Sequence, residues 1–357
     1  DSVYSGLENE TIWEECLFDE EEQLKHEEEI SALLSGETYV HADMSGEELY
    51  PSEFVEFAIK LSIAGGIRDF SFADRPYLKH IYDSSARRIL LKCGRQVEKS
   101  TLLGNLCLAY SALNPAFKTL YVSATAQQAQ VFSVDRIKEP IETSQVLSHL
   151  TNRALSQNVF FKQFTNRSQI RLRYAFLSAD RVRGIPADKI LIDEIQDIIT
   201  ENIPVIEECA SHSEWKLMRY SGTPKSLDNT IEVYWQQFST QNEWMVPCES
   251  CNNWNELGER NIGRTGVICA KCGKPIVVRH PKAMWASKNP ITKDNVDQVA
   301  FEGYRIPQIM VPWVTDSEEG WNDIILKQKQ YSRSKFFNEV LGLSYDSGTR
   351  PLKSNQI

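Results

Sequence analysis

A short apolar run that leads into a basic, hydroxyl-bearing loop restricts the fold of this chain most. The run is Ile89-Leu90-Leu91, and the loop after it ends in Lys99-Ser100-Thr101. Residues from Lys99 to about Leu113 are typical of a helix, so the segment predicts strand, loop and helix. A lysine and a hydroxyl at the point where a loop enters a helix indicate a phosphate-binding loop, because free N–H groups at a helix N-terminus attract anions.

The loop departs from the usual phosphate-loop pattern, G-x-x-x-x-G-K-[ST]. Aligned on Lys99-Ser100, the first glycine position holds Cys93 and the second holds Glu98. The binding chemistry can survive both changes, because backbone N–H groups make most of the phosphate contacts. We expect the Glu98 carboxylate, which would repel phosphates, to point outward or to pair with Arg95. An ordinary helix N-terminus is the alternative interpretation of the loop.

A second apolar run ends in two carboxylates. Ile190-Leu191-Ile192 precedes Asp193 and Glu194, and a continuous apolar run suits a strand buried on both faces of a parallel sheet. We expect this strand to neighbour the strand of the phosphate loop. Lys99 would then reach the β- and γ-phosphates of ATP, while Ser100 and Asp193 would bind Mg²⁺. Glu194 would act as the general base that orients the attacking water; the alternative is a solvated acidic turn.

Four cysteines have the spacing of a zinc site. Cys248 and Cys251 form one C-x-x-C pair, and Cys269 and Cys272 form another after seventeen intervening residues. Two such knuckles can close a tetrahedron of thiolates with no open position, so we predict a structural Zn²⁺ in a zinc ribbon over residues 245–280. Four free thiols in a reducing compartment are the alternative. Disulfides are not expected, because no signal-peptide pattern indicates secretion.

The acidic residues are concentrated at the N-terminus. The 357-residue chain has a net charge of −10, from 39 Lys and Arg and 49 Asp and Glu. Residues 1–50 hold sixteen Asp or Glu against one Lys, which is −15 and leaves +5 for residues 51–357. We interpret residues 1–50 as an acidic arm, which is either a solvated or partly disordered segment or a docking element. The chain has no run of 18 apolar residues, so no membrane span is expected.

Strand and helix patterns alternate along the rest of the chain. This alternation predicts an α/β fold in which a parallel sheet carries helices on both faces. Further strands are expected near residues 119–123, 169–177, 189–192, 216–221 and 301–313, and helices near 51–88, 127–147 and 316–341. The predicted domains are an ATPase domain over 51–244 and 281–345, the zinc ribbon inserted at 245–280, and a linker at 346–357.

Five segments, in this order, resemble the ATPase domain of a large terminase subunit, the DNA-packaging motor of tailed bacteriophages. They are Gly94-Arg95-Gln96-Val97-Glu98-Lys99-Ser100-Thr101, Ser123-Ala124-Thr125-Ala126-Gln127-Gln128-Ala129, Arg181-Val182-Arg183-Gly184, Ser221-Gly222-Thr223-Pro224 and Phe337-Asn338-Glu339-Val340-Leu341-Gly342. The cysteine-bearing insertion resembles that of the lambda-like branch. The resemblance runs from about Phe70 to Gly342 and implies an ASCE/RecA-like P-loop NTPase that hydrolyses ATP with Mg²⁺.

The resemblance also implies roles for single residues. Arg95 would sense the γ-phosphate, and Arg183 would be an arginine finger offered to the next subunit. Thr223 would couple hydrolysis to movement. Tyr77 or Tyr82 would stack on adenine, with core packing as the alternative for each. The nucleotide-binding loop would comprise Gly94, Arg95, Gln96, Val97, Glu98, Lys99, Ser100 and Thr101.

A finger supplied by a neighbour implies a homo-oligomeric ring. The implied partners are double-stranded DNA, the portal protein and the small terminase subunit, in the host cytoplasm with transient docking on the procapsid and no membrane. DNA phosphates would contact basic side chains, for which solvated charge is the alternative. The candidates are Lys162, Arg167, Arg171, Arg173, Arg260, Arg264, Lys271 and Lys274.

Two other functions stay open at this point. One is a superfamily 2 helicase-like ATPase, because residues 123–125 and 221–223 also resemble helicase motifs. The other is a non-hydrolysing, zinc-containing adaptor of DNA or protein, in which Glu98 blocks the nucleotide. Large terminases also carry a nuclease domain, for which the residues after Gly342 are too few, so we expect the parent protein to cut DNA through a domain outside this chain.

Overall fold

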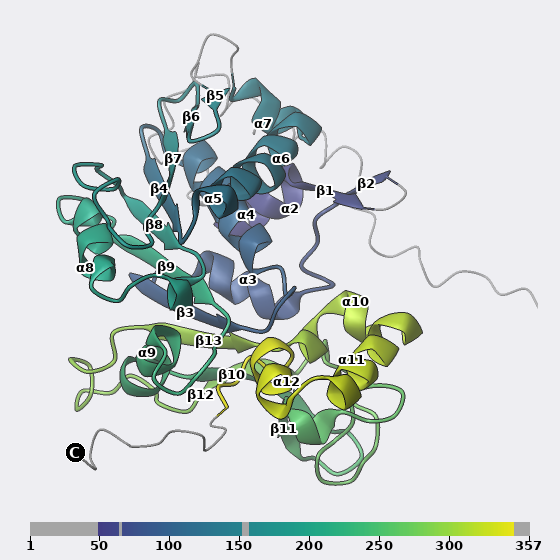
Figure 1. The fold of residues 1–357 in the computed structure, drawn as a ribbon. Helices are drawn as coiled ribbons and strands as arrows, with labels where there is room; N and C mark the ends of the chain where they lie inside the picture. The colour runs from purple at the N-terminus through teal and green to yellow at the C-terminus, as the bar shows by residue number, and fades with distance from the viewer. Residues whose placement is uncertain (1–48, 64–65, 152–156, 346–357) are drawn as a thin grey trace, which may run out of the picture. The chain divides into compact units, whose positions relative to one another are not determined.

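A single large sheet organises the computed structural model, which describes residues 49–63, 66–151 and 157–345 (Figure 1). Within this described part, seven adjacent strands of the sheet are parallel. In spatial order they are β10 (Asn242–Pro247), β13 (Glu302–Ile306), β3 (Arg88–Cys93), β9 (Leu217–Gly222), β8 (Lys189–Ile192), β4 (Lys118–Ser123) and β7 (Gln169–Tyr174). The predicted α/β class with a parallel sheet is confirmed.

The strand order corrects one expectation. The strand of the phosphate loop, β3, does not neighbour β8, because β9 lies between them and pairs in parallel with both. The carboxyl ends of all three strands therefore meet at the same edge of the sheet, where residues that follow β3 and β8 can approach each other across the end of β9.

Short antiparallel strands extend both sides of the parallel sheet. On one side, β6 (Phe161–Gln163) pairs with β7 and with β5 (Gln157–Asn158). On the other side, β11 (Trp254–Glu256) and β12 (Met284–Ser287) both pair with β10. Because β12 runs antiparallel to β10, the residues between them start and end at one place in the sheet, and β11 within that stretch also pairs with β10.

Helices cover both faces of the sheet (Figure 1). One face carries α4 (Lys99–Leu113) and α5 (Ala126–Phe132), with α2 (Pro51–Ala58) and α3 (Pro76–Asp83) packed on α4. A π-helical segment (Ser133–Lys138) joins α5 to α6 (Glu139–Thr143), and α7 (Gln145–His149) follows. The opposite face carries α8 (Asn202–Glu207) and α9 (Thr230–Phe238). Three further helices follow β13: α10 (Pro312–Thr315), α11 (Glu318–Gln330) and α12 (Arg333–Glu339).

Burial on both faces of the sheet explains the apolar run of β8 after Lys189. Ile190 and Ile192 pack into the core beneath α8 and α9, and the alternating side chains of Lys189 and Leu191 point to the face covered by α4. All four residues are fully buried. Asp193 continues the alternation, so its carboxylate emerges on the α4 face.

Helix α4 and strand β8 have the bounds that the sequence predicts, whereas three predicted helices are interrupted. The segment 51–88 contains the antiparallel hairpin β1 (Lys60–Ile63) and β2 (Gly66–Asp69) between α2 and α3. The polar–apolar alternation of Lys60-Leu61-Ser62-Ile63 before two glycines is the hairpin signal that the helical interpretation overlooked. The predicted helices 127–147 and 316–341 both break at a serine.

The two serines end one helix and begin the next. Ser144 is extended and its hydroxyl accepts a hydrogen bond from the backbone N–H of Leu147, which starts α7. Ser332 does the same for the N–H of Lys335 at the start of α12. A serine side chain that satisfies a free N–H group is a favoured helix N-cap, so each break has a local cause.

The predicted domain boundaries stay predictions. Residues 1–48 of the acidic arm and the linker at 346–357 lie outside the described residues. The described residues belong to one compact unit, and β10 runs across the predicted boundary at residue 245. No helix in the described ranges is both long enough and apolar enough to cross a membrane.

Lys189 is a buried cation without a hydrogen-bond partner among the described residues. Its ammonium nitrogen lies 3.2 Å from the centre of the Tyr110 ring. Burial and the nearby guanidinium of Arg219 lower the pKa of Lys189 well below its usual value, which the thiol of Cys107 only partly offsets. The position therefore costs stability rather than adding to it.

We expect Lys189→Met to raise the free energy of unfolding at pH 7 by about 1–3 kcal/mol, because it removes an unpaired polar group. An unfolded lysine keeps its proton to about pH 10, whereas Lys189 loses it at lower pH in the folded state. Between these two pKa values the unfolded state binds more protons than the folded state. The free energy of unfolding of the parent therefore rises with pH in this range, whereas that of Lys189→Met does not. Urea unfolding at several pH values measures both effects.

Lys118→Met is the matched control, since Lys118 is also the first residue of a parallel strand but is only half-buried. It should leave the pH slope unchanged. A loss of stability in Lys189→Met would contradict this account and would mean that the contact with Tyr110 outweighs the cost of burial.

Candidate functional site

The loop between β3 and α4 is anchored at its base. The backbone N–H of Gly94 donates to the carbonyl of Ile306 at 2.9 Å, and that of Arg95 donates to the carbonyl of Glu339 at 2.7 Å. Gln96 and Glu98 adopt left-handed backbone conformations, with φ of 53° and 62°. The loop is thus held by the end of β13 and the end of α12 and turns sharply into α4.

The N-terminus of α4 is open to a ligand. Glu98 occupies the N-cap position, but its side chain makes no capping hydrogen bond. The first N–H groups of a helix have no acceptor within the helix, and the helix dipole makes this end positive. Lys99, Ser100 and Thr101 form the first turn, so the loop has the features of an anion-binding site.

Glu98 pairs with Arg75 and not with Arg95, which corrects that expectation. Both carboxylate oxygens are engaged: Arg75 Nη2 donates to Glu98 Oε1 at 2.8 Å, and Arg75 Nε donates to Oε2. Arg95 is exposed instead, and its Nη1 lies 3.5 Å from Glu339 Oε1.

Asp193 lies buried beneath the first turn of α4. Its Oδ1 accepts hydrogen bonds from the Ser221 hydroxyl at 2.6 Å and from the N–H of Glu194 at 3.0 Å. Its Oδ2 accepts a bond from the Tyr121 hydroxyl at 3.0 Å and lies 3.4 Å from Ser100 Oγ. Burial is the largest effect on this carboxyl group and raises its pKa, although Lys99 acts in the opposite direction.

Lys99, Glu194, Gln196 and Thr223 form a closed ring of hydrogen bonds. Lys99 Nζ donates to Glu194 Oε1 at 2.5 Å, and Gln196 Nε2 donates to Glu194 Oε2 at 2.5 Å. The backbone N–H of Thr223 donates to Gln196 Oε1 at 3.2 Å, and Lys99 Nζ also lies 3.3 Å from Thr223 Oγ1. A Cβ on residue 222 would lie only 2.0 Å from Gln196 Oε1, so the absence of a side chain at Gly222 leaves room for Gln196.

The ring also sets the charge of Glu194. Burial raises the pKa of this carboxyl group, but the ammonium of Lys99 and hydrogen bonds from Lys99 and Gln196 outweigh burial and lower it overall. In the same way Glu194 and Asp193 raise the pKa of Lys99 against its burial. The lysine and the glutamate are therefore both charged at neutral pH.

Ser100 and Asp193 fit a magnesium ion. Mg²⁺ prefers hard oxygen ligands, often one or two carboxylates together with substrate phosphates. The Ser100 hydroxyl and Asp193 Oδ2 are neighbouring oxygens of this kind, and the open end of α4 lies beside them. Four separate segments of the chain, at residues 98–101, 121, 193–196 and 221–223, thus meet at one edge of the sheet.

Tyr77 and Tyr82 do not fit the predicted contact with adenine. Both side chains are fully buried. The ring of Tyr77 packs edge-on against Trp244 with centroids 6.2 Å apart, and the Tyr82 hydroxyl accepts a hydrogen bond from Asn105. These rings fill the core, so the prediction that one of them stacks on the base is wrong for this structure.

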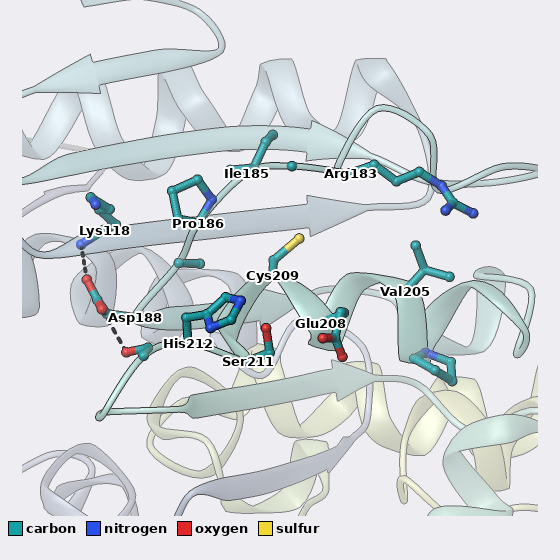
Figure 2. A pocket seen from close by; sticks show the side chains of 14 residues that line it. Lys118, Arg183, Ile185, Pro186, Asp188, Val205, Glu208, Cys209, Ser211 and His212 are labelled. Carbon is teal, nitrogen blue, oxygen red and sulfur yellow. Dashed lines mark hydrogen bonds between the residues drawn. The ribbon is translucent and has the colours of Figure 1, made fainter.

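Arg183 lies on the segment between β7 and β8. This segment and the residues after α8 line a pocket, with Lys118 and Asp188 at one end and Arg183 at the other (Figure 2). The side chain of Arg183 is 65% exposed, and within the described ranges Asp180, at 3.1 Å, is its one ion-pair partner. The guanidinium is therefore presented outward.

The four cysteine sulfurs converge on one point. All four lie within 4.8 Å of one another. The Cys248 and Cys272 sulfurs are 3.6 Å apart, and those of Cys251 and Cys269 are 3.7 Å apart. A tetrahedral zinc ion with Zn–S bonds of about 2.3 Å separates its sulfurs by about 3.8 Å, whereas a disulfide needs about 2.05 Å. The cluster fits Zn²⁺ and does not fit disulfides.

The two C-x-x-C turns have the same backbone structure. The N–H groups of Asn252 and Gly273 donate to the carbonyls of Cys248 and Cys269 at 2.8 and 2.9 Å. Asn252 and Gly273 both have left-handed φ angles, of 55° and 72°.

Burial raises the pKa of the Cys269 thiol, but backbone N–H groups and the neighbouring thiols outweigh it and lower the pKa to about 6. For Cys251 the backbone at Asn253 lowers the pKa, but burial and the neighbouring thiols outweigh it and raise the pKa to about 12. One thiol of this pair thus ionises readily and the other holds its proton more tightly, as expected for close thiols that hydrogen-bond to each other.

The basic candidates for DNA contact differ in accessibility. Strand β7 has the predicted alternation, with Arg171 and Arg173 half-buried on the face opposite Ile170 and Leu172. Lys162 is 5% exposed, and burial lowers its pKa, so it is not a free surface cation. The candidates in the cysteine-bearing insertion are exposed: Arg260, Arg264, Lys271 and Lys274.

Four residues of the site are not assigned a role by the sequence patterns. Gln196 follows the Asp-Glu pair by two positions, and Ser221 opens the predicted coupling segment, so both are near recognised motifs. Tyr121 is an aromatic residue inside a strand, and Arg75 is one arginine among many. Their roles depend on contacts between distant segments, which sequence spacing does not reveal.

Comparison with protein families finds one match. The sequence model of the family described as "Phage terminase large subunit gpA, ATPase domain" matches residues 68–289, which is more than half of the chain. The matched region includes the phosphate loop, the Asp-Glu pair and the four cysteines. No curated protein sequence matches the chain.

Several solved structures are similar at low identity. The large terminase ATPase domain of Thermus phage P74-26 is 18% identical, with 74% of this chain and 92% of that chain covered and a TM-score of 0.47. The HK97 bacteriophage large terminase is 13% identical, with coverages of 52% and 40% and a TM-score of 0.41. The large terminase of a thermophilic bacteriophage, in complex with ATP-γ-S, is 9% identical, with coverages of 77% and 52% and a TM-score of 0.43.

We expect the purified chain to bind one zinc ion and Cys272→Ser to lose most of it, because a structural site needs all four thiolates. The melting temperature should fall by about 10 °C or more, since binding of a structural zinc contributes directly to folding. Metal analysis and thermal unfolding measure the two effects. Cys209→Ser changes a half-buried cysteine outside the cluster and should keep the zinc; zinc content unchanged in Cys272→Ser would contradict the assignment.

Proposed function

The chain belongs to the family of phage terminase large subunit ATPase domains of the gpA type, and we propose that it hydrolyses ATP to move double-stranded DNA into a procapsid. One observation carries the proposal. Lys99 at the open N-terminus of α4 meets Glu194, which follows β8, at 2.5 Å across the end of β9. A phosphate-binding cation and a general base thus share one site.

The nucleotide phosphates would bind at the start of α4. Backbone N–H groups of residues 96–101 and the ammonium of Lys99 would contact them. Ser100 and Asp193 would hold Mg²⁺, which would neutralise charge on the phosphate oxygens. The Asp193 carboxylate is fixed for this role by Ser221 and Tyr121.

Binding of a triphosphate would open the ion pair between Lys99 and Glu194. Lys99 would then contact phosphate, and the released Glu194 carboxylate would orient a water molecule and accept its proton. Burial raises the pKa of Glu194, but in the structure Lys99 and Gln196 lower it overall. The departure of Lys99 to the phosphates would remove the larger of these two lowering effects and make the carboxylate a stronger base. Gln196 would hold the second carboxylate oxygen in place.

Gln196 also gives the coupling role of Thr223 a physical basis. The same amide side chain contacts Glu194 through its nitrogen and the backbone of Thr223 through its oxygen. A movement of Glu194 on ATP binding or hydrolysis would therefore displace the start of the segment after β9. We propose this contact as the first step from hydrolysis to movement.

Arg183 would complete the site of a neighbouring subunit. Its side chain is 65% exposed and, among the described residues, pairs only with Asp180, which supports a role in trans. Arg95, which is exposed in the phosphate loop, would contact the γ-phosphate from within the same subunit. We propose a ring of identical subunits on the procapsid, with DNA, portal protein and small terminase subunit as partners.

Two alternative functions are less well supported. The family match favours the terminase over a superfamily 2 helicase. The adaptor hypothesis required Glu98 to exclude the nucleotide, and the pairing of Glu98 with Arg75 removes that reason. Zinc would act as a structural ion, and a nuclease activity would belong to the parent protein outside this chain.

The first test is ATP turnover by Glu194→Gln and Arg183→Ala, alone and mixed, with duplex DNA. Each variant alone should lose at least about a hundredfold in rate, because one lacks the base and the other the finger. In a 1:1 mixture, a subunit with intact Arg183 can complete the intact site of its neighbour. The mixture should therefore recover a measurable fraction of the parental rate.

The mixing experiment separates the parts of the proposal. No recovery on mixing, with both variants inactive, would mean that Arg183 acts in its own subunit. Full activity of Arg183→Ala would remove the finger assignment and keep the ATPase. Turnover by Glu194→Gln at the parental rate would contradict the proposed base.

A second prediction concerns Gln196. Gln196→Leu should lower kcat about 10- to 100-fold and leave KM within about threefold, because Gln196 orients the base and does not contact the phosphate loop. Steady-state kinetics over a range of ATP concentrations gives both constants. Lys225→Met is the control, since it removes only an exposed ion pair with Asp197; equal losses in the two variants would argue against a role for Gln196.

A further inference from the structure

Glu98 places a negative charge where the usual phosphate loop has none. It directly precedes Lys99 and has the left-handed φ of 62° that suits glycine at this position. Its side chain is only 15% exposed and lies at the N-terminus of α4. An unpaired carboxylate there would be close to bound phosphates and poorly screened by water.

Arg75 meets this charge with a fixed, two-point contact. Its Nε and Nη2 atoms bind the two oxygens of Glu98, in the bidentate geometry that gives arginine–carboxylate pairs their strength and direction. The pair joins the segment before α3 to the phosphate loop, across 23 positions of sequence.

The position of Arg75 is itself determined by its surroundings. The side chain is 2% exposed, with its guanidinium 5.2 Å from the centre of the Phe70 ring. Its Nη1 donates to the carbonyl of Ser71 at 3.3 Å and lies 3.7 Å from Asp74 Oδ2. The arginine is thus built into the fold beside the loop, and Glu98 uses both of its oxygens on it.

We propose that Arg75 is a positioning residue of the nucleotide site, which neutralises and holds Glu98 so that this loop accepts a triphosphate. The inference rests on the proposed ATPase function. It explains how a loop without the second glycine of the usual pattern keeps a favourable potential for phosphates. Arg75 acts through Glu98 and does not contact the nucleotide itself.

The test measures binding of Mg²⁺ and the slowly hydrolysed analogue ATP-γ-S to the full chain by calorimetry. Arg75→Met should weaken affinity at least about tenfold, because the freed carboxylate repels phosphate. Glu98→Gln should not weaken affinity, because it removes the same negative charge and keeps the backbone N–H groups of the loop. The double variant Arg75→Met with Glu98→Gln should return to within about threefold of the parent, because the repelling charge is gone.

Recovery of affinity on adding Glu98→Gln is the readout that a purely structural role of Arg75 would not give, because the single and the double variant differ only in the charge at residue 98. If Arg75→Met does not fold, Arg75→Lys takes its place, because lysine keeps the positive charge but cannot make the two-point contact with Glu98. It should show a smaller loss of affinity that Glu98→Gln again removes.

The outcomes separate this inference from the proposed function. A parent chain that binds ATP-γ-S, with Arg75→Met unchanged, overturns the inference and leaves the ATPase proposal intact. Equal losses in the single and double variants also overturn it, because Arg75 would then act on the fold or on the nucleotide directly. A parent chain that binds no nucleotide removes the proposed function and this inference with it.

Discussion

Compensation of charge at the carboxyl edge of the parallel sheet is the constraint on which the site depends. Strands β3, β8 and β9 end side by side, so a lysine, two carboxylates and the polar residues after β9 are brought together with little access to water. Isolated charges would be costly there. Each one is met by a partner: Lys99 by Glu194, Glu98 by Arg75, and Asp193 by hydroxyl groups. The resting site is therefore a closed network, and a ligand with its own negative charge must exchange partners within it.

The same principle ties the phosphate loop to distant parts of the chain. Lys92, two residues before Gly94, forms a buried ion pair with Glu232 of α9 at 2.6 Å. Arg305, in the strand beside β3, pairs with Glu243 at 2.7 Å and donates to the carbonyls of Leu257, in the cysteine-bearing insertion, and Leu341, after α12. Removing one member of such a buried pair is far more costly than changing a surface pair. The loop, the insertion and the segment after α12 are thus parts of one rigid framework.

Local sequence patterns were sufficient for much of the fold. Strand β8 could be predicted because its apolar run suits burial on both faces of a sheet. The bounds of α4 could be predicted because a phosphate loop leads directly into a helix. The four cysteines likewise converge as their spacing indicates. The failures have a shared cause. The partner of Glu98, the burial of Tyr77 and the position of β9 between β3 and β8 are all decided by packing between segments far apart in sequence. Such contacts have no local signal, whereas the hairpin at residues 60–69 had one that was overlooked.

Charge also bears on the role of the cysteine-bearing insertion. Residues 245–280 contain five Lys or Arg and three Glu, which sum to +2. A zinc ion bound by four thiolates carries a net charge of −2, so the metal-loaded insertion is neutral overall. Lys271, between the second pair of cysteines, and Lys274 next to them are placed to offset the thiolates. With zinc bound, their charge would already be balanced, so they would contribute less to DNA binding than a count of basic residues suggests. The insertion is better suited to supporting β10, β12, α11 and α12 than to binding DNA, since Trp321 of α11 and Arg333 of α12 both donate hydrogen bonds to it.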